Sequence, residues 1–201
     1  MRNGSFAGRG GMCGVGIKFI MMLLAIGAIF GCAKPRPTLV VVVGGLGLSQ
    51  LGDVRRAVQS QCPGADVVNA GGWDWYKADL PEIVRNKPHQ HVVFIGHSFG
   101  CGAIAEASRQ VKAVELAVFI DPAWSDFHLP TTIGRYLWYK RSGFGIEREA
   151  QIVGASNPQT IRGGHNDIPH SPELIAGVVS AINRIKDAPA SGDAARRVAA
   201  R

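Results

Sequence analysis

The sequence predicts an α/β fold, with a mainly parallel sheet and helices on both of its faces. Short runs rich in Val and Ile alternate with helical segments. Near-continuous apolar strands of this kind are typical of parallel sheets that are covered on both sides. The span 39–186 is about 150 residues, which is enough for one core and too short for two, so we expect a single domain there.

The expected elements follow in order along that domain. The strands are β-branched runs too short for helices, at 39–43, 65–69, 92–95, 116–120, 135–140 and near 160–161. Helical segments separate them, at 52–60, 78–84, directly after 98, and in a closing helix at 172–185. Ligands of such folds bind at the carboxyl ends of the strands, and each motif below lies at such an end.

The sequence Gly-His-Ser-Phe-Gly at 96–100 follows the apolar strand at 92–95. In a G-x-S-x-G turn, glycines two residues either side of the serine permit a strained strand-to-helix turn that exposes the hydroxyl. Small residues continue after Gly100, so the next helix can pack closely on the sheet. The motif predicts that Ser98 is a nucleophile; the alternative is a plain strand-turn-helix with a bystander serine.

A carboxylate follows the next expected strand. Asp121 comes directly after 116–120, a position suited to orienting an imidazole and stabilising its charged form. The alternative is a turn residue before Pro122. Asp126 and Asp74 are weaker candidates for the same role.

A histidine lies on the glycine-rich loop before the closing helix. His165 follows the last strand directly and is the expected base, with His170 or His97 as alternatives. We expect Asp167 to brace this loop. A two-histidine metal site formed by His165 and His170 is a less favoured interpretation.

Glycines also follow the first strand, at 44, 45 and 47. They let the chain turn sharply with its amides facing outward, ready to donate to a developing oxyanion. The rival interpretation is a dinucleotide site, but Gln50 stands where the third glycine of G-x-G-x-x-G belongs.

The chain order Ser98, Asp121, His165 resembles that of the α/β-hydrolase superfamily, and the resemblance covers nearly the whole domain. An acid on the strand after the nucleophile's helix is similar to thioesterase-type and pancreatic-lipase-type members. The resemblance implies an α/β-hydrolase fold with a minimal or no cap domain, and a serine esterase or thioesterase that needs no cofactor or metal. It also implies an oxyanion hole of backbone amides, from Phe99 and from Leu46 or Gly45, although Gly44 stands where many relatives carry His.

The expected substrate is a small ester or thioester. Trp124 and Phe127, on the loop after the acid, are candidates for an acyl pocket, and Trp73 and Trp75 for its other wall. A second class of function stays open, because folds of this kind also serve as catalytically inactive binding modules.

The first 31 residues are expected to be a signal peptide, with a positive start and an apolar run at 19–31. The sequence at 29–32 resembles the bacterial lipobox, which implies that Cys32 carries the acyl chains, such as palmitate, of a lipoprotein. Residues 32–38 would then be a tether to the membrane of the cell envelope, with the outer membrane or periplasmic face favoured. The alternative is an uncleaved signal anchor.

The tail at 187–201 is Ala-rich without apolar periodicity and is expected to be disordered. The formal net charge of +7 falls to about +4 once Arg2, Arg9 and Lys18 leave with the signal peptide. No basic cluster interleaved with aromatics is present, so we expect no nucleic-acid partner. Cys62 and Cys101 are expected to be buried thiols, with a disulfide between them as the alternative.

Overall fold

The computed structural model describes residues 37–45, 51–71, 79–143 and 148–186. Several predictions lie outside these ranges: the signal peptide, most of the tether with Cys32, the tail, and the roles given to Leu46, Trp73, Asp74 and Trp75. They stay predictions. Within the described ranges, no helix combines the length and the apolar character needed to cross a bilayer.

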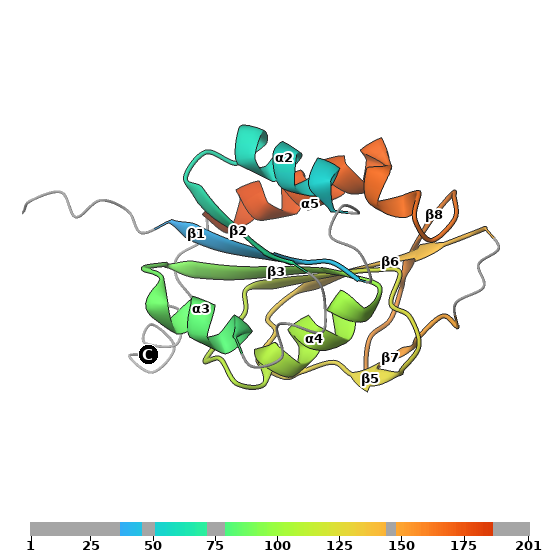
Figure 1. Cartoon of the computed structure of the whole chain (residues 1–201), viewed down its shortest axis with the longest axis horizontal. Coiled ribbons are helices and arrows are strands. Elements are labelled where there is room, and N and C mark those ends of the chain that lie inside the picture. Colours follow the sequence, from blue (N-terminus) through green and yellow to red (C-terminus); the bar gives the residue numbers. More distant parts are fainter. Residues whose placement is uncertain (1–36, 46–50, 72–78, 144–147, 187–201) are drawn as a thin grey trace, which may run out of the picture. The chain divides into compact units, whose positions relative to one another are not determined.

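Six parallel strands form the main sheet, in the order β2-β1-β3-β4-β6-β8 (Figure 1). Their bounds are β1 Thr38–Val43, β2 Ala65–Gly71, β3 His91–His97, β4 Leu116–Ile120, β6 Tyr136–Arg141 and β8 Gln159–Ile161. The predicted parallel sheet is confirmed, because each of these six strands overlaps an expected one. The central strands β1, β3 and β4 are buried along their whole length, as continuous apolar runs require.

Helices cover both faces of this sheet, as predicted. Figure 1 shows α2 (Gly52–Gln61) and α5 (Pro172–Lys186) on one face, and α3 (Leu80–Asn86) and α4 (Phe99–Ser108) on the other. Alternate residues of each strand point to opposite faces. In β1, Val40 and Val42 therefore join the core beneath α2 and α5, whereas the odd-numbered residues pack towards α3 and α4.

Three short elements were not expected from the sequence. β5 (Phe127–His128) and β7 (Ile152–Val153) pair as a separate two-stranded parallel sheet, and β5 lies near α4. A 3-10 turn, η2 (Ile168–His170), precedes α5. Strands of two residues leave no alternation in the sequence, so no periodicity could have indicated them.

The two described cysteines are buried on opposite sides of the sheet. Cys62 packs in the core beneath α2 and α5, and Cys101 in the core beneath α3 and α4. The alternative of a disulfide between them is therefore wrong. Burial raises the pKa of the Cys101 thiol well above its ordinary value, and its Sγ donates to the carbonyl of Gly96 at 3.2 Å.

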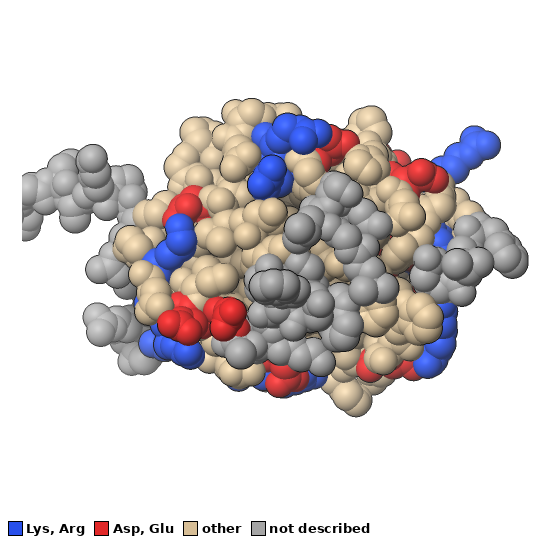
Figure 2. Space-filling view, in the orientation of Figure 1, with Lys and Arg blue, Asp and Glu red and all other residues tan. Residues whose placement is uncertain are grey.

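Charged side chains of both signs are interspersed on the face shown in Figure 2. Several form pairs on the surface, among them Arg109 with Glu106 at 2.6 Å and Arg148 with Asp126 at 2.9 Å. Exposed pairs of this kind contribute little to stability, so the fold depends chiefly on its two apolar layers.

Candidate active site

The turn after β3 holds Ser98 in a strained conformation. Its φ and ψ are 56° and −124°, and α4 begins at the next residue. A Cβ atom on Gly96 would lie 2.7 Å from the carbonyl oxygen of Gly100, and one on Gly100 would lie 2.3 Å from that of Val43. Both glycines are therefore required by the close approach of the first turn of α4 to β1 and β3.

Asp121 ends the neighbouring strand and lies at the same edge of the sheet. His97 pairs with Ile120 in the β3–β4 register, so Ser98 and Asp121 are the next residues on adjacent strands. The Ser98 amide donates to the Ile120 carbonyl at 3.0 Å. Within the described ranges, only four non-glycine residues have positive φ, and Ser98, Asp121 and Trp124 are three of them. Such strain concentrates at functional sites.

His165 is in direct contact with Asp121. Its Nδ1 lies 2.5 Å from Asp121 Oδ2, and both side chains are buried. The contact to a carboxylate favours the tautomer with the proton on Nδ1. Nε2 is then unprotonated and can accept a proton. The loop that carries His165 is closed by Asp167, whose Oδ2 accepts from the Gly164 amide at 3.0 Å. Asp167 thus braces the loop as expected.

The Ser98 hydroxyl makes no hydrogen bond to the His165 ring in the described part of the chain. Catalytic hydrogen bonds are often long or poorly aligned in the absence of substrate and tighten when it binds. The structure therefore brings Asp121 and His165 together and places Ser98 at the end of the adjacent strand.

Arg141 is a member of this cluster that the sequence did not indicate. Its Nη1 donates to Asp121 Oδ2 at 2.7 Å and lies 3.2 Å from His165 Nδ1. Burial opposes ionisation of Asp121, but the His165 hydrogen bond and the Arg141 charge outweigh it, so the pKa of Asp121 is lowered. The expected strand ended at residue 140, one residue short of Arg141. A cation at the carboxyl end of a strand was the signal that could have found it.

His97 is hydrogen-bonded to the loop that carries His165, and it is not positioned to act as the general base. Its ring is fully buried, its Nε2 donates to the His165 carbonyl at 3.1 Å, and the two rings lie 4.6 Å apart. Its Nδ1 is buried without a hydrogen-bond partner. Burial, followed by repulsion from His165, lowers the pKa of His97 to about 4. The ring is therefore neutral near pH 7.

His170 lies on η2 and pairs with a different carboxylate. Its Nδ1 is 2.5 Å from Asp53 Oδ2, and its side chain is half exposed. His165 and His170 thus have separate partners, and the geometry gives a shared metal site no support. Among the described residues, no group of three or more potential metal ligands gathers in one place. Asp126 pairs with Arg148 instead of with a histidine.

Gly45, two residues after β1, lies directly against the serine. A Cβ atom on Gly45 would lie 2.7 Å from Ser98 Cβ and 3.1 Å from Ser98 Oγ. The Gly44 amide is engaged by the Gly71 carbonyl at 2.7 Å. The Phe99 amide belongs to the first turn of α4, where the helix dipole favours negative charge. Of the expected oxyanion donors, Gly45 and Phe99 thus flank Ser98.

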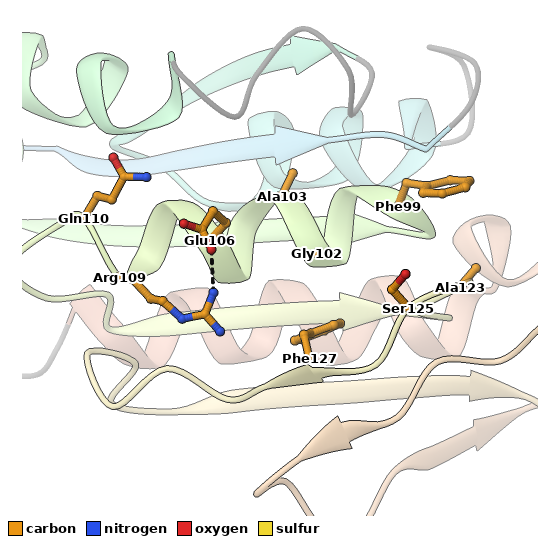
Figure 3. Close-up of a pocket in the computed structure, with 9 residues that line it drawn as sticks. All are labelled: Phe99, Gly102, Ala103, Glu106, Arg109, Gln110, Ala123, Ser125 and Phe127. Atoms are coloured by element: carbon orange, nitrogen blue, oxygen red, sulfur yellow. Dashed lines mark hydrogen bonds and ion pairs between the residues drawn. The ribbon is translucent and has the colours of Figure 1, made fainter.

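A groove of about 660 Å³ runs beside α4 (Figure 3). Phe127, one of the expected pocket residues, lines it together with Phe99. Trp124 does not line the groove but stacks on the Phe99 ring, with centroids 5.6 Å apart and planes inclined by 17°. The indole is half exposed.

No protein-family model matches this chain, and no curated protein matches it. One solved structure with detectable similarity is that of the histone deacetylase Clr3, at 10% sequence identity and a TM-score of 0.41. The similarity covers 73% of this chain and 32% of that one. A likeness at this level carries no inference about the site.

Because His97 is buried and neutral in the fold, the free energy of unfolding should depend on pH. Unfolded histidine takes up a proton near pH 6.5, but His97 in the fold does so only near pH 4. The unfolded state therefore binds more protons between these values, and the free energy of unfolding should fall by about 3 kcal/mol as pH drops from 6.5 to 4. His97→Asn should remove this contribution, as measured by urea unfolding across that range.

The exposed His128 supplies the control for that experiment. His128→Asn makes the same replacement at an exposed position and so controls for the substitution itself. The lowered pKa of Asp121 interferes little, because its contribution is lost mainly below its ordinary value of 3.8 and is present in both variants. A slope that is the same in His97→Asn and in the wild type would contradict the assignment.

Arg141→Met should destabilise the protein by about 3–5 kcal/mol, because it leaves the buried Asp121 carboxylate without its cation. Urea unfolding at pH 7 measures this loss. Lys140→Met is the matched control on the same strand, since Lys140 and Glu149 form a partly exposed pair at 3.5 Å. That control should cost no more than about 1 kcal/mol. Equal losses of unfolding free energy in the two variants would show that the Arg141–Asp121 pair contributes no more than the partly exposed pair.

Proposed function

We propose that this chain is a serine hydrolase that cleaves esters or thioesters, with an α/β-hydrolase type of site. The single observation that carries the proposal is the buried contact of 2.5 Å between Asp121 and His165, beside the strained turn of Ser98. A carboxylate, an imidazole and a serine at the ends of one sheet are the groups that acyl transfer through a covalent intermediate requires.

Each group has a distinct role in the proposed reaction. His165 Nε2 takes the proton of the Ser98 hydroxyl as its oxygen attacks the substrate carbonyl, and later returns it to the leaving group. Asp121 holds the ring through Nδ1 and stabilises the imidazolium that forms. The Phe99 and Gly45 amides would receive the negative charge of the tetrahedral intermediate. Water then cleaves the acyl-enzyme with His165 as the base.

The second candidate is a binding module without catalysis, and two observations favour it. The Ser98 hydroxyl is not hydrogen-bonded to His165 among the described residues. In addition, Arg141 Nη1 donates to the same Asp121 oxygen that His165 Nδ1 contacts, so the carboxylate is shared with a permanent cation. Covalent reactivity of Ser98 discriminates between the two candidates.

A fluorophosphonate probe should label the full-length wild-type protein at Ser98, and Ser98→Ala should abolish both the labelling and hydrolysis of p-nitrophenyl acetate. The melting temperature should stay close to that of the wild type, because the hydroxyl makes no hydrogen bond within the described residues. Ser108→Ala is a control, since that serine is bonded within α4 to the Ile104 carbonyl. An unlabelled wild-type protein would favour the binding module.

His165→Ala should lower kcat by several orders of magnitude through loss of the general base. His170→Ala should cost tenfold or less, about 1.4 kcal/mol, because that ring pairs with Asp53 on the surface. Steady-state kinetics with p-nitrophenyl acetate measure both. A larger loss of kcat in His170→Ala than in His165→Ala would identify His170 as the general base. Small, equal losses of kcat in both variants would mean that there is no working triad.

A further inference from the structure

The groove beside α4 has a floor made by two small residues in the middle of the helix. Gly102 and Ala103 line it, and Phe99 and Phe127 supply aromatic walls (Figure 3). Glycine inside a helix is destabilising, so such a position usually has a packing reason. A Cβ atom on Gly102 would meet nothing within 4 Å in the described part of the chain, so no close approach there explains this glycine. Its effect is to leave the groove open.

One end of the groove is lined by residues that lie close in sequence to the candidate active site. Phe99 directly follows Ser98, and its amide is a proposed oxyanion donor. Ala123, which also lines the groove, comes two residues after Asp121. Figure 3 shows Phe99 and Ala123 at the end where α4 begins, with Arg109 and Gln110 towards the other end. A group attached to Ser98 could therefore extend along α4.

The far end of the groove offers paired charges. Glu106 and Arg109 form an ion pair at 2.6 Å, shown as a dashed line in Figure 3, and Arg109 also donates to the His128 carbonyl at 3.2 Å. Their opposite charges neutralise each other, so this end does not favour a substrate tail of either sign. The groove thus suits a neutral chain along its apolar middle.

We infer that the groove beside α4 binds the acyl chain of the substrate, and that the substrate is a neutral, unbranched fatty acyl ester or thioester. This inference rests on the proposed function. Helix α4, from Phe99 to Ser108, spans about 14 Å, at 1.5 Å per residue. An extended hydrocarbon of about 12 carbons has that length, given the geometry of C–C bonds. The volume of about 660 Å³ is within the range of small-molecule sites.

The test compares p-nitrophenyl acetate with the octanoate and dodecanoate esters on the full-length protein. In the wild type, kcat/KM should be at least about tenfold higher for octanoate than for acetate. Gly102→Met places a side chain in the groove and should lower kcat/KM for octanoate by about tenfold or more, with acetate within about twofold. Lys112→Met is the matched control, because it introduces the same side chain at an exposed position outside the groove, and both esters should stay within about threefold.

The outcomes separate this inference from the proposed function. Equal loss of acetate and octanoate activity in Gly102→Met, or no loss for octanoate, overturns the groove as the acyl site. A wild-type protein that is labelled by fluorophosphonate at Ser98 but shows no chain-length preference overturns the groove alone. Absence of both labelling and acetate hydrolysis overturns the proposed function, and this inference with it.

Discussion

The buried carboxylate of Asp121 is the group on which the candidate site depends. It accepts from Arg141 on β6 and from His165 on the loop after β8, so one side chain joins three strand ends. An ionised carboxylate in an apolar core is unfavourable unless it is paired and hydrogen-bonded. The two partners meet that requirement together. The same contacts fix the plane of the His165 ring. The interactions that stabilise the buried carboxylate therefore also orient the candidate base.

Close to this carboxylate, burial keeps His97 neutral. Its ring braces the loop that carries His165 through the His165 carbonyl, and a positive charge on the ring would be opposed by burial and by repulsion from His165. The site thus holds one anion, one permanent cation and two imidazole rings at the edge of a buried sheet. In the proposed reaction, the amides near Ser98 would receive the negative charge that develops on the substrate.

The sequence predicted the sheet, its helices and the residues that follow each strand, because each of these has a local signature. The glycines around Ser98 indicated the tight turn, and Asp121 and His165 were found from their places after apolar runs. Arg141 was missed because its role depends on pairing between β4 and β6, which are distant in sequence, and on a strand boundary that periodicity places only approximately. The groove was missed in part because its wall at β5 is a strand of two residues.

The loop that carries His165 has a consequence for the time course of biosynthesis. It follows β8, a three-residue strand at the edge of the sheet. His165 contacts Asp121, which lies 44 residues earlier in the sequence. The Ser98 turn and Asp121 belong to β3 and β4, which leave the ribosome earlier. A nascent chain can therefore build its serine turn well before its imidazole arrives. In the proposed reaction, such a nascent chain would lack its general base until the loop after β8 has been made.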